Sequence, residues 1–164
     1  MSLSVASTLS ISNPISIYEH GKKYSLIESI QIIMNCIMVC IENKQEYYAN
    51  AGKNVMGAMF VVYDICIYNP PNNYSKELYE YALDSLIDLI EKYTTGLNYY
   101  DKKLKYFKYI YYQSISITYN KTYNFLDKMY AKRTGLLPLK DSLEKKFMDH
   151  YAITKEELDS LEEQ

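Results

Sequence analysis

Apolar side chains recur at spacings of three and four residues along most of this chain, and this pattern predicts a protein built from α-helices. The first run covers residues 26–42, and Ser25 and Glu28 form a capping-box pattern ahead of it. A second run, residues 55–68, is apolar on nearly every side, so we expect it to be buried or to lie in an interface. A third, residues 76–93, is amphipathic with an acidic outer face. We expect Ser75 to cap its start, and a glycine follows its end.

The fourth and longest helix is predicted for residues 97–131. A helical wheel places on its buried side Leu104, Phe107, Ile110, Tyr111, Ser114, Ile117, Thr118, Phe125 and Met129. The same wheel places Lys102, Lys105, Lys108, Tyr109 and Tyr112 on its exposed side. Residues 109–119 alternate between apolar and hydroxyl side chains, so a strand is the competing interpretation. If the segment is a helix, its β-branched middle predicts a bend or break within residues 114–120.

The C-terminal part of the chain predicts two short helices, residues 142–150 and 155–164. Asp141 with Glu144, and Thr154 with Glu157, have the spacing of capping boxes ahead of them. Two short helices across a tight turn resemble a helix-turn-helix in outline. The second one carries five carboxylates, which DNA phosphates would repel, so we reject that interpretation.

These patterns together predict an all-α protein: a bundle of four main helices with a short C-terminal helical hairpin and an extended N-terminal arm. The expected division is an extended or flexible arm at residues 1–24, a bundle domain at residues 25–134, and an acidic hairpin at residues 135–164 packed on or beside it. The arm has no basic start, so it is not interpreted as a secretion signal.

One segment differs in charge from the rest of the chain. The chain has a net charge of −2, yet residues 97–134 carry eight cationic and two acidic side chains, and the segments on either side are acidic. Lysines beside tyrosine rings are typical of nucleic-acid contact. The candidate nucleic-acid residues are Lys102, Lys105, Lys108, Tyr109, Tyr112, Lys128, Lys132 and Arg133. A solvated or protein-contacting face is the alternative, and the acidic C-terminal segment of a neighbouring copy is one such partner.

Candidate catalytic chemistry is sparse. The chain has two histidines, five glycines and no phosphate-loop or hydrolase motif, so we expect no enzyme and no cofactor. Cys36, Cys40 and Cys66 are odd in number and lie in apolar runs, so we expect buried thiols rather than disulfides, and no metal site. Asp64 stands alone in an apolar run and is expected to meet a polar neighbour rather than to catalyse.

The function predicted from the sequence is a non-enzymatic structural or interaction protein that self-associates through apolar helices. The alternative is a nucleic-acid-binding subunit that uses the Lys/Tyr face of residues 97–134, either a nucleoprotein coat or the small helical subunit of a larger nucleoprotein complex. We expect a homo-oligomer, no membrane partner, and a reducing intracellular or cytoplasmic location. The bias towards Ile, Lys, Asn and Tyr is typical of AT-rich genomes and consistent with a viral or mobile-element origin, in which case the location is the virion.

Overall fold

The computed structural model describes residues 15–16, 23–24, 26–42, 51–67, 74–98 and 101–163. Nearly all of them are helical, which confirms the all-α class. Two short strands pair antiparallel, with Ile15 opposite Tyr24 and Ser16 opposite Lys23. The elements are β1 (Ile15–Ser16), β2 (Lys23–Tyr24), α1 (Leu26–Glu42), α2 (Ala51–Ile67), α3 (Ser75–Thr94), α4 (Asp101–Thr122), α5 (Asn124–Leu126), the π-helix η2 (Asp127–Ala131), α6 (Lys132–Thr134), α7 (Leu139–Tyr151) and α8 (Lys155–Glu162).

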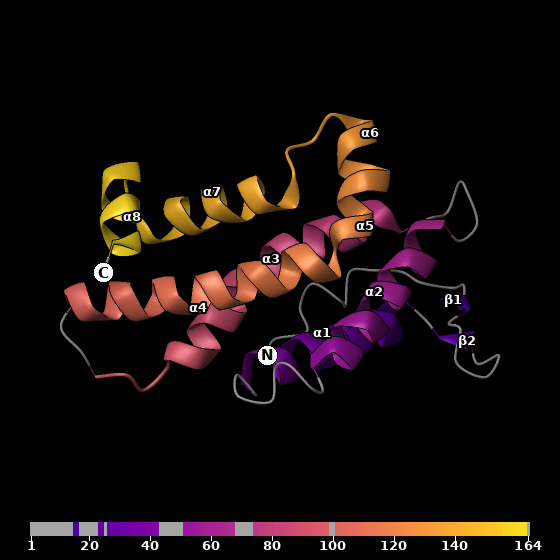
Figure 1. The fold of residues 1–164 in the computed structure, drawn as a ribbon, viewed down its shortest axis with the longest axis horizontal. Coiled ribbons are helices and arrows are strands. Elements are labelled where there is room, and N and C mark those ends of the chain that lie inside the picture. Colours follow the sequence, from indigo (N-terminus) through magenta and orange to yellow (C-terminus); the bar gives the residue numbers. More distant parts are fainter. Residues whose placement is uncertain are drawn as a thin grey trace.

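Helix α4 lies in the middle of the arrangement (Figure 1). It packs along α3, and the two helices have α1 and α2 on one side and α7 on the other. The helices α1 and α2 pack closely against each other, and β1 and β2 contact this pair. Because α4 has neighbours on two sides, its buried surface is wider than the single stripe of an ordinary amphipathic helix.

The hydrophobic core is continuous through the described helices. Its fully buried side chains come from helices throughout the chain, from α1 to α8, and they include Leu26, Ile33, Met34, Ile65, Leu78, Leu86, Tyr119, Leu143, Phe147 and Leu158. Helix α7 therefore contributes to the same core as α1 to α4. The division into three parts at residues 24 and 134 stays a prediction, as does most of the N-terminal arm, which lies outside the described residues.

The first three helices agree with the sequence pattern in type and closely in extent. Helix α1 has the predicted bounds, whereas α2 begins four residues earlier than expected. The predicted cap of α3 is wrong, because Ser75 is its first helical residue and is buried, and Tyr74 occupies the cap position. Gly96 follows the end of α3 with φ 82°, a left-handed conformation that glycine adopts without strain. The capping box at Ser25 lies outside the described residues.

The predicted break within residues 114–120 is absent, and the strand interpretation is wrong. Helix α4 runs unbroken from Asp101 to Thr122, and it is interrupted only at Tyr123. Thr118 donates its hydroxyl hydrogen bond to the Ser114 carbonyl (2.9 Å), which satisfies this β-branched polar side chain within the helix. After Tyr123 the chain continues through α5, the π-helix and α6, which stand at a steep angle to α4 (Figure 1).

Two helix caps were predicted for the C-terminal hairpin, and one of them is present. Helix α7 begins at Leu139 after Pro138, so Asp141 is not its cap but lies in its first turn, where a carboxylate still favours the helix dipole. The capping box of α8 is confirmed. The Thr154 hydroxyl accepts from the Glu157 amide (3.2 Å), and the Thr154 amide donates to the Glu157 carboxylate (3.0 Å).

Candidate interaction surfaces

The predicted Lys/Tyr face of α4 is only partly a surface. Tyr109 is 1% exposed and Tyr112 is 6% exposed, so their predicted exposure is wrong. Both rings pack against Phe147 of α7, and the Tyr112 and Phe147 rings stack with centroids 4.4 Å apart. Ile117, predicted to be buried, is 54% exposed. The cause is α7, which covers the side of α4 that the helical wheel had assigned to solvent.

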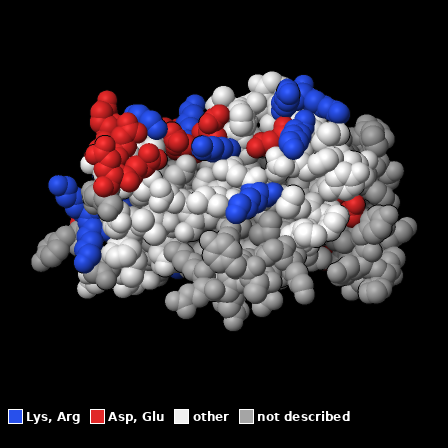
Figure 2. All heavy atoms as spheres, in the orientation of Figure 1, with Lys and Arg blue, Asp and Glu red and all other residues white. Residues whose placement is uncertain are grey.

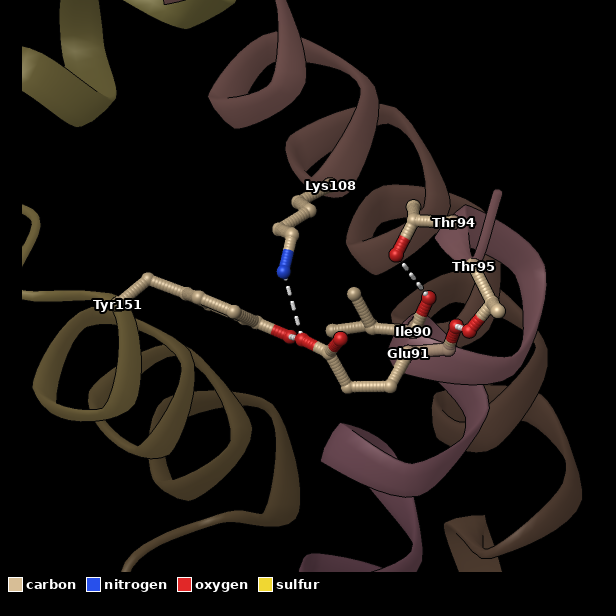
Figure 3. A network of polar contacts seen from close by, with 6 residues as sticks. All are labelled: Ile90, Glu91, Thr94, Thr95, Lys108 and Tyr151. Carbon is tan, nitrogen blue, oxygen red and sulfur yellow. Dashed lines mark hydrogen bonds and ion pairs between the residues drawn. The ribbon is translucent and has the colours of Figure 1, made fainter. Parts of the chain in front are cut away.

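Lys108 has a structural partner on α3 (Figure 3). Its ammonium lies 2.6 Å from the Glu91 carboxylate, and the Tyr151 hydroxyl of α7 donates to the same oxygen atom, also at 2.6 Å. The ammonium also lies 4.5 Å from the centroid of the Tyr151 ring. One carboxylate thus joins α3, α4 and α7. Burial by itself would raise the pKa of Glu91, but hydrogen bonds from Lys108 and Tyr151 and the lysine charge hold it below its usual range.

We expect a Lys108→Met substitution to lower the free energy of unfolding by about 1–2 kcal/mol at neutral pH, a value reduced for the half-exposed carboxylate. A carboxyl whose pKa is lowered by folding stabilises the protein above its unfolded pKa, near 4.5, and this contribution disappears as the pH falls through the folded value. Urea unfolding at neutral and acidic pH should therefore show a difference between variant and parent that shrinks on acidification.

Lys105→Met is the matched control, because Lys105 makes a longer, exposed ion pair with Glu157 (3.7 Å). We expect no measurable change in stability from that variant. Equal effects of the two substitutions would show that the contact between Lys108 and Glu91 has no special role.

The acidic helix α8 lies beside the basic start of α4. A groove of ≈ 690 Å³ runs between them, lined by Lys102, Lys103, Lys105, Tyr106, Ile153, Glu156, Glu157, Ser160 and Leu161. One of the alternatives drawn from the sequence was that the acidic segment of a neighbouring copy meets these lysines. In the structure the chain's own acidic helix does so, through the ion pair between Lys105 and Glu157. The charges on the two walls of this groove partly offset each other.

The other predicted cations lie at the opposite end of α4. Lys128, Lys132 and Arg133 are exposed on the π-helix and α6. Helix α4 alone is about 33 Å long at 1.5 Å per residue, so these cations are well separated from Lys102. Figure 2 shows basic side chains gathered at the α6 end and acidic ones gathered at the α8 end. The eight predicted residues are thus not brought together: they divide into two separate groups and two buried tyrosines.

A surface that the sequence did not resolve lies on α2. Its outer face exposes Met56 (55%), Phe60 (56%), Tyr63 (41%) and Ile67 (42%), which follow one another at spacings of four, three and four residues. Together they form one stripe, called here the α2 stripe. The sequence signal was present, because residues 55–68 are apolar on nearly every side. It could not show which face α1, α4 and α5 would leave uncovered.

The described residues show little that resembles an enzyme or metal centre. They contain no group of three or more His, Cys, Asp or Glu side chains placed to hold a metal ion. Cys36, Cys40 and Cys66 are free thiols, and burial raises the pKa of Cys66 to about 11. Asp64, which stands alone in its apolar run, is buried.

Two further findings bear on the class of protein. Within the described part of the chain, every helix is too short or too polar to cross a lipid bilayer. Comparison of the chain with protein-family models, with curated proteins and with solved structures finds no match. The class that the structure defines is therefore an all-α protein, and any function has to be argued from its surfaces.

Proposed function

We propose that this protein is a non-enzymatic interaction protein that associates with a second copy of itself through the α2 stripe. The observation that carries the proposal is the run of four large apolar side chains, each more than two-fifths exposed, along one helix face. Large contiguous apolar patches are uncommon on monomers, because each such side chain gains about 1.5–3 kcal/mol on burial.

A second copy is the partner that suits this face. In a two-fold dimer the same patch meets itself, so any charge on it would face a like charge. The exposed positions of the α2 stripe are all uncharged. Gly57 lies beside them, exposed, and a side chain there would meet nothing within 4 Å. Glycine at this position allows the backbone of a facing helix to approach closely.

Sedimentation velocity over a range of protein concentrations tests the proposal. The parent chain should shift from monomer to dimer or larger species as its concentration rises. Phe60→Glu places a carboxylate at the centre of the stripe, and in a symmetric interface it does so twice. We expect this variant to raise the dissociation constant at least about 30-fold, which corresponds to about 2 kcal/mol.

Leu137→Glu is the matched control. Leu137 is 54% exposed, nearly the same fraction as Phe60, but it lies in the loop after α6. Its substitution should leave the association constant unchanged. A parent chain that stays monomeric at every concentration would contradict the proposal, as would equal weakening by the two variants.

The proposal also includes the way in which the helices and the N-terminal arm are arranged. We infer that α1 to α4 act as the bundle of four main helices, and that the N-terminal arm is extended outside the β1–β2 pair, which itself contacts α1 and α2. A reducing intracellular location, or a virion if the protein is viral, fits the three free thiols.

The alternative function, nucleic-acid binding, stays a prediction, and fewer of the predicted residues are placed to support it. Tyr109 and Tyr112 are buried, and Lys108 is engaged with Glu91, which leaves Lys102 at one end and Lys128, Lys132 and Arg133 at the other as its exposed cations. Nothing in the described geometry favours this alternative over self-association.

A further inference from the structure

A fixed loop at the end of α6 presents two leucines to solvent. Leu136 is 43% exposed and Leu137 is 54% exposed, in the turn that connects α6 to α7. Figure 1 shows this turn at an edge of the molecule. A contact that covers both leucines removes apolar surface from water, so a partner with an apolar region gains free energy by binding them.

Hydrogen bonds hold the loop backbone in place. The Leu136 amide donates to the Ala131 carbonyl (2.9 Å), and the Tyr79 hydroxyl donates to the Leu137 carbonyl (2.8 Å). Gly135 takes the left-handed conformation, φ 73°, that ends α6. The next residues turn inward, because Leu139 is fully buried and its amide donates to Asp127 (2.8 Å). The two leucines therefore project from an ordered backbone.

Cations lie on both sides of these leucines in the sequence. Residues 128–140 contain Lys128, Lys132, Arg133 and Lys140 and no acidic residue, and Asp127 and Asp141 flank this range. All four are exposed, and the ion pairs seen among the described residues involve none of them. Figure 2 shows basic side chains gathered at this end beside uncharged surface and some acidic atoms, while the larger acidic group lies at the α8 end. We call residues 128–140 the basic loop. This range includes most of the π-helix, α6, the turn after it and the start of α7.

We propose that the basic loop is a peripheral docking site for an anionic lipid surface. The two leucines enter the boundary between headgroups and acyl chains, and the cations bind lipid phosphates and carboxylates. Each of these contributions is weak alone, and stable attachment to a membrane generally requires both kinds of contact. This site is separate from the α2 stripe and does not depend on self-association. It also differs from a membrane span, which the helices of the described chain do not provide.

The chemistry favours lipid over nucleic acid. Phosphates of DNA or RNA would use the four cations but gain nothing from the leucines, whereas an acyl-chain boundary uses both. Single-stranded nucleic acid would also need exposed rings for stacking. The aromatic residue of the basic loop, Tyr130, is partly buried and packs against Tyr79 with ring centroids 5.9 Å apart.

Flotation of the full chain with vesicles tests the proposal. We expect binding to vesicles of phosphatidylcholine with phosphatidylserine, weaker binding at high salt, and little binding to phosphatidylcholine alone. Lys132→Gln combined with Arg133→Gln should lower the partition coefficient about 30-fold, from about 1 kcal/mol for each cation. Leu136→Gln combined with Leu137→Gln should lower it at least about tenfold while leaving both charges in place.

A charge-matched control separates the basic loop from net charge. Lys76→Gln combined with Lys145→Gln removes two exposed cations from α3 and α7, and should change the partition coefficient by less than about threefold. Each variant is also measured with Phe60→Glu, so that multivalent binding by an oligomer does not hide a loss in affinity. If the glutamine pair alters the far-ultraviolet circular dichroism, Leu136→Ala combined with Leu137→Ala replaces it.

Three results would overturn the proposal. The first is the absence of binding to anionic vesicles at low salt. The second is a loss of binding in the charge-matched control equal to that in the basic-loop variants. The third is binding that is insensitive to both leucine pairs and is displaced by DNA or RNA at the same salt concentration, which would identify the loop as a nucleic-acid contact instead.

Discussion

Replacing Phe147 by alanine is expected to lower the free energy of unfolding by about 3–5 kcal/mol. The Phe147 ring is fully buried, stacks on Tyr112 and meets the edge of Tyr151 (ring centroids 5.2 Å apart). Its removal leaves a cavity between α4 and α7 that rigid aromatic neighbours cannot readily fill. Because a domain of this size is stable by roughly 5–15 kcal/mol, the variant should unfold at a much lower urea concentration.

Phe60→Ala is the matched control for that result. It removes the same atoms from a ring that is 56% exposed, so at concentrations where the chain is monomeric it should change stability by less than about 0.5 kcal/mol. A loss below about 1 kcal/mol in the Phe147 variant would mean that α7 does not pack on α4 in the way described. A single unfolding transition in the parent would show that the C-terminal hairpin unfolds together with the bundle.

Alkaline unfolding is the second large effect that we expect. The chain has 20 tyrosines, and burial raises the pKa of several of them, including Tyr112 to about 12. A tyrosine with a raised pKa holds its proton more tightly when folded, so its stabilisation is complete below pH 10 and is lost as the pH rises through the folded value. A rise of two units corresponds to roughly 3 kcal/mol for one buried tyrosine. Tyr119 and Tyr123 are shifted upward by burial as well.

Several such groups together are comparable with the whole free energy of unfolding, so the protein should unfold cooperatively between about pH 10 and pH 12. Tyrosinate absorbance and circular dichroism, followed in one titration, check this expectation. The exposed tyrosines should ionise first, and the buried ones should ionise together with the loss of helix. Complete ionisation with the helical signal unchanged would contradict the burial of these rings.

Two conservative variants sharpen the alkaline experiment. The buried Tyr123 hydroxyl has no hydrogen-bond partner among the described residues, so Tyr123→Phe should stabilise the protein by about 1–2 kcal/mol and move the transition to higher pH. The Tyr119 hydroxyl, by contrast, shares a 2.7 Å hydrogen bond with Ser85, so Tyr119→Phe should lower stability by about 1 kcal/mol. Destabilisation by both variants would show that Tyr123 has a polar partner too.

The sequence pattern predicted a helix best where the helix packs on one side only or where its cap involves neighbouring residues only. Helix α3 has a clear apolar side and an acidic side, and only one of its two sides meets the core, so the pattern predicted both its extent and its faces. The capping box of α8 involves neighbouring residues only, and Thr154 and Glu157 form it as predicted. The Asp141 cap failed because Pro138 already starts α7 three residues earlier.

Helix α4 shows where local signals were insufficient. Tyrosine has an apolar ring and a polar hydroxyl, so Tyr109 and Tyr112 suit either a core or a surface. The choice depended on Phe147, which is 38 residues beyond Tyr109 in the chain and stacks on Tyr112. A contact with another helix also explains the outcome for Lys108. It was predicted to bind nucleic acid, but it forms an ion pair with Glu91 of α3.

The sequence by itself determined that the chain is helical, the approximate positions of its helices, and that charge is unevenly distributed along it. Those properties arise from residues within a turn or two of one another. Tertiary structure alone decided which side of α4 is buried, that the cations separate into two groups, and that the α2 stripe and the leucines of the basic loop face solvent. These depend on which helices pack together, and contacts between residues far apart in the chain set that packing.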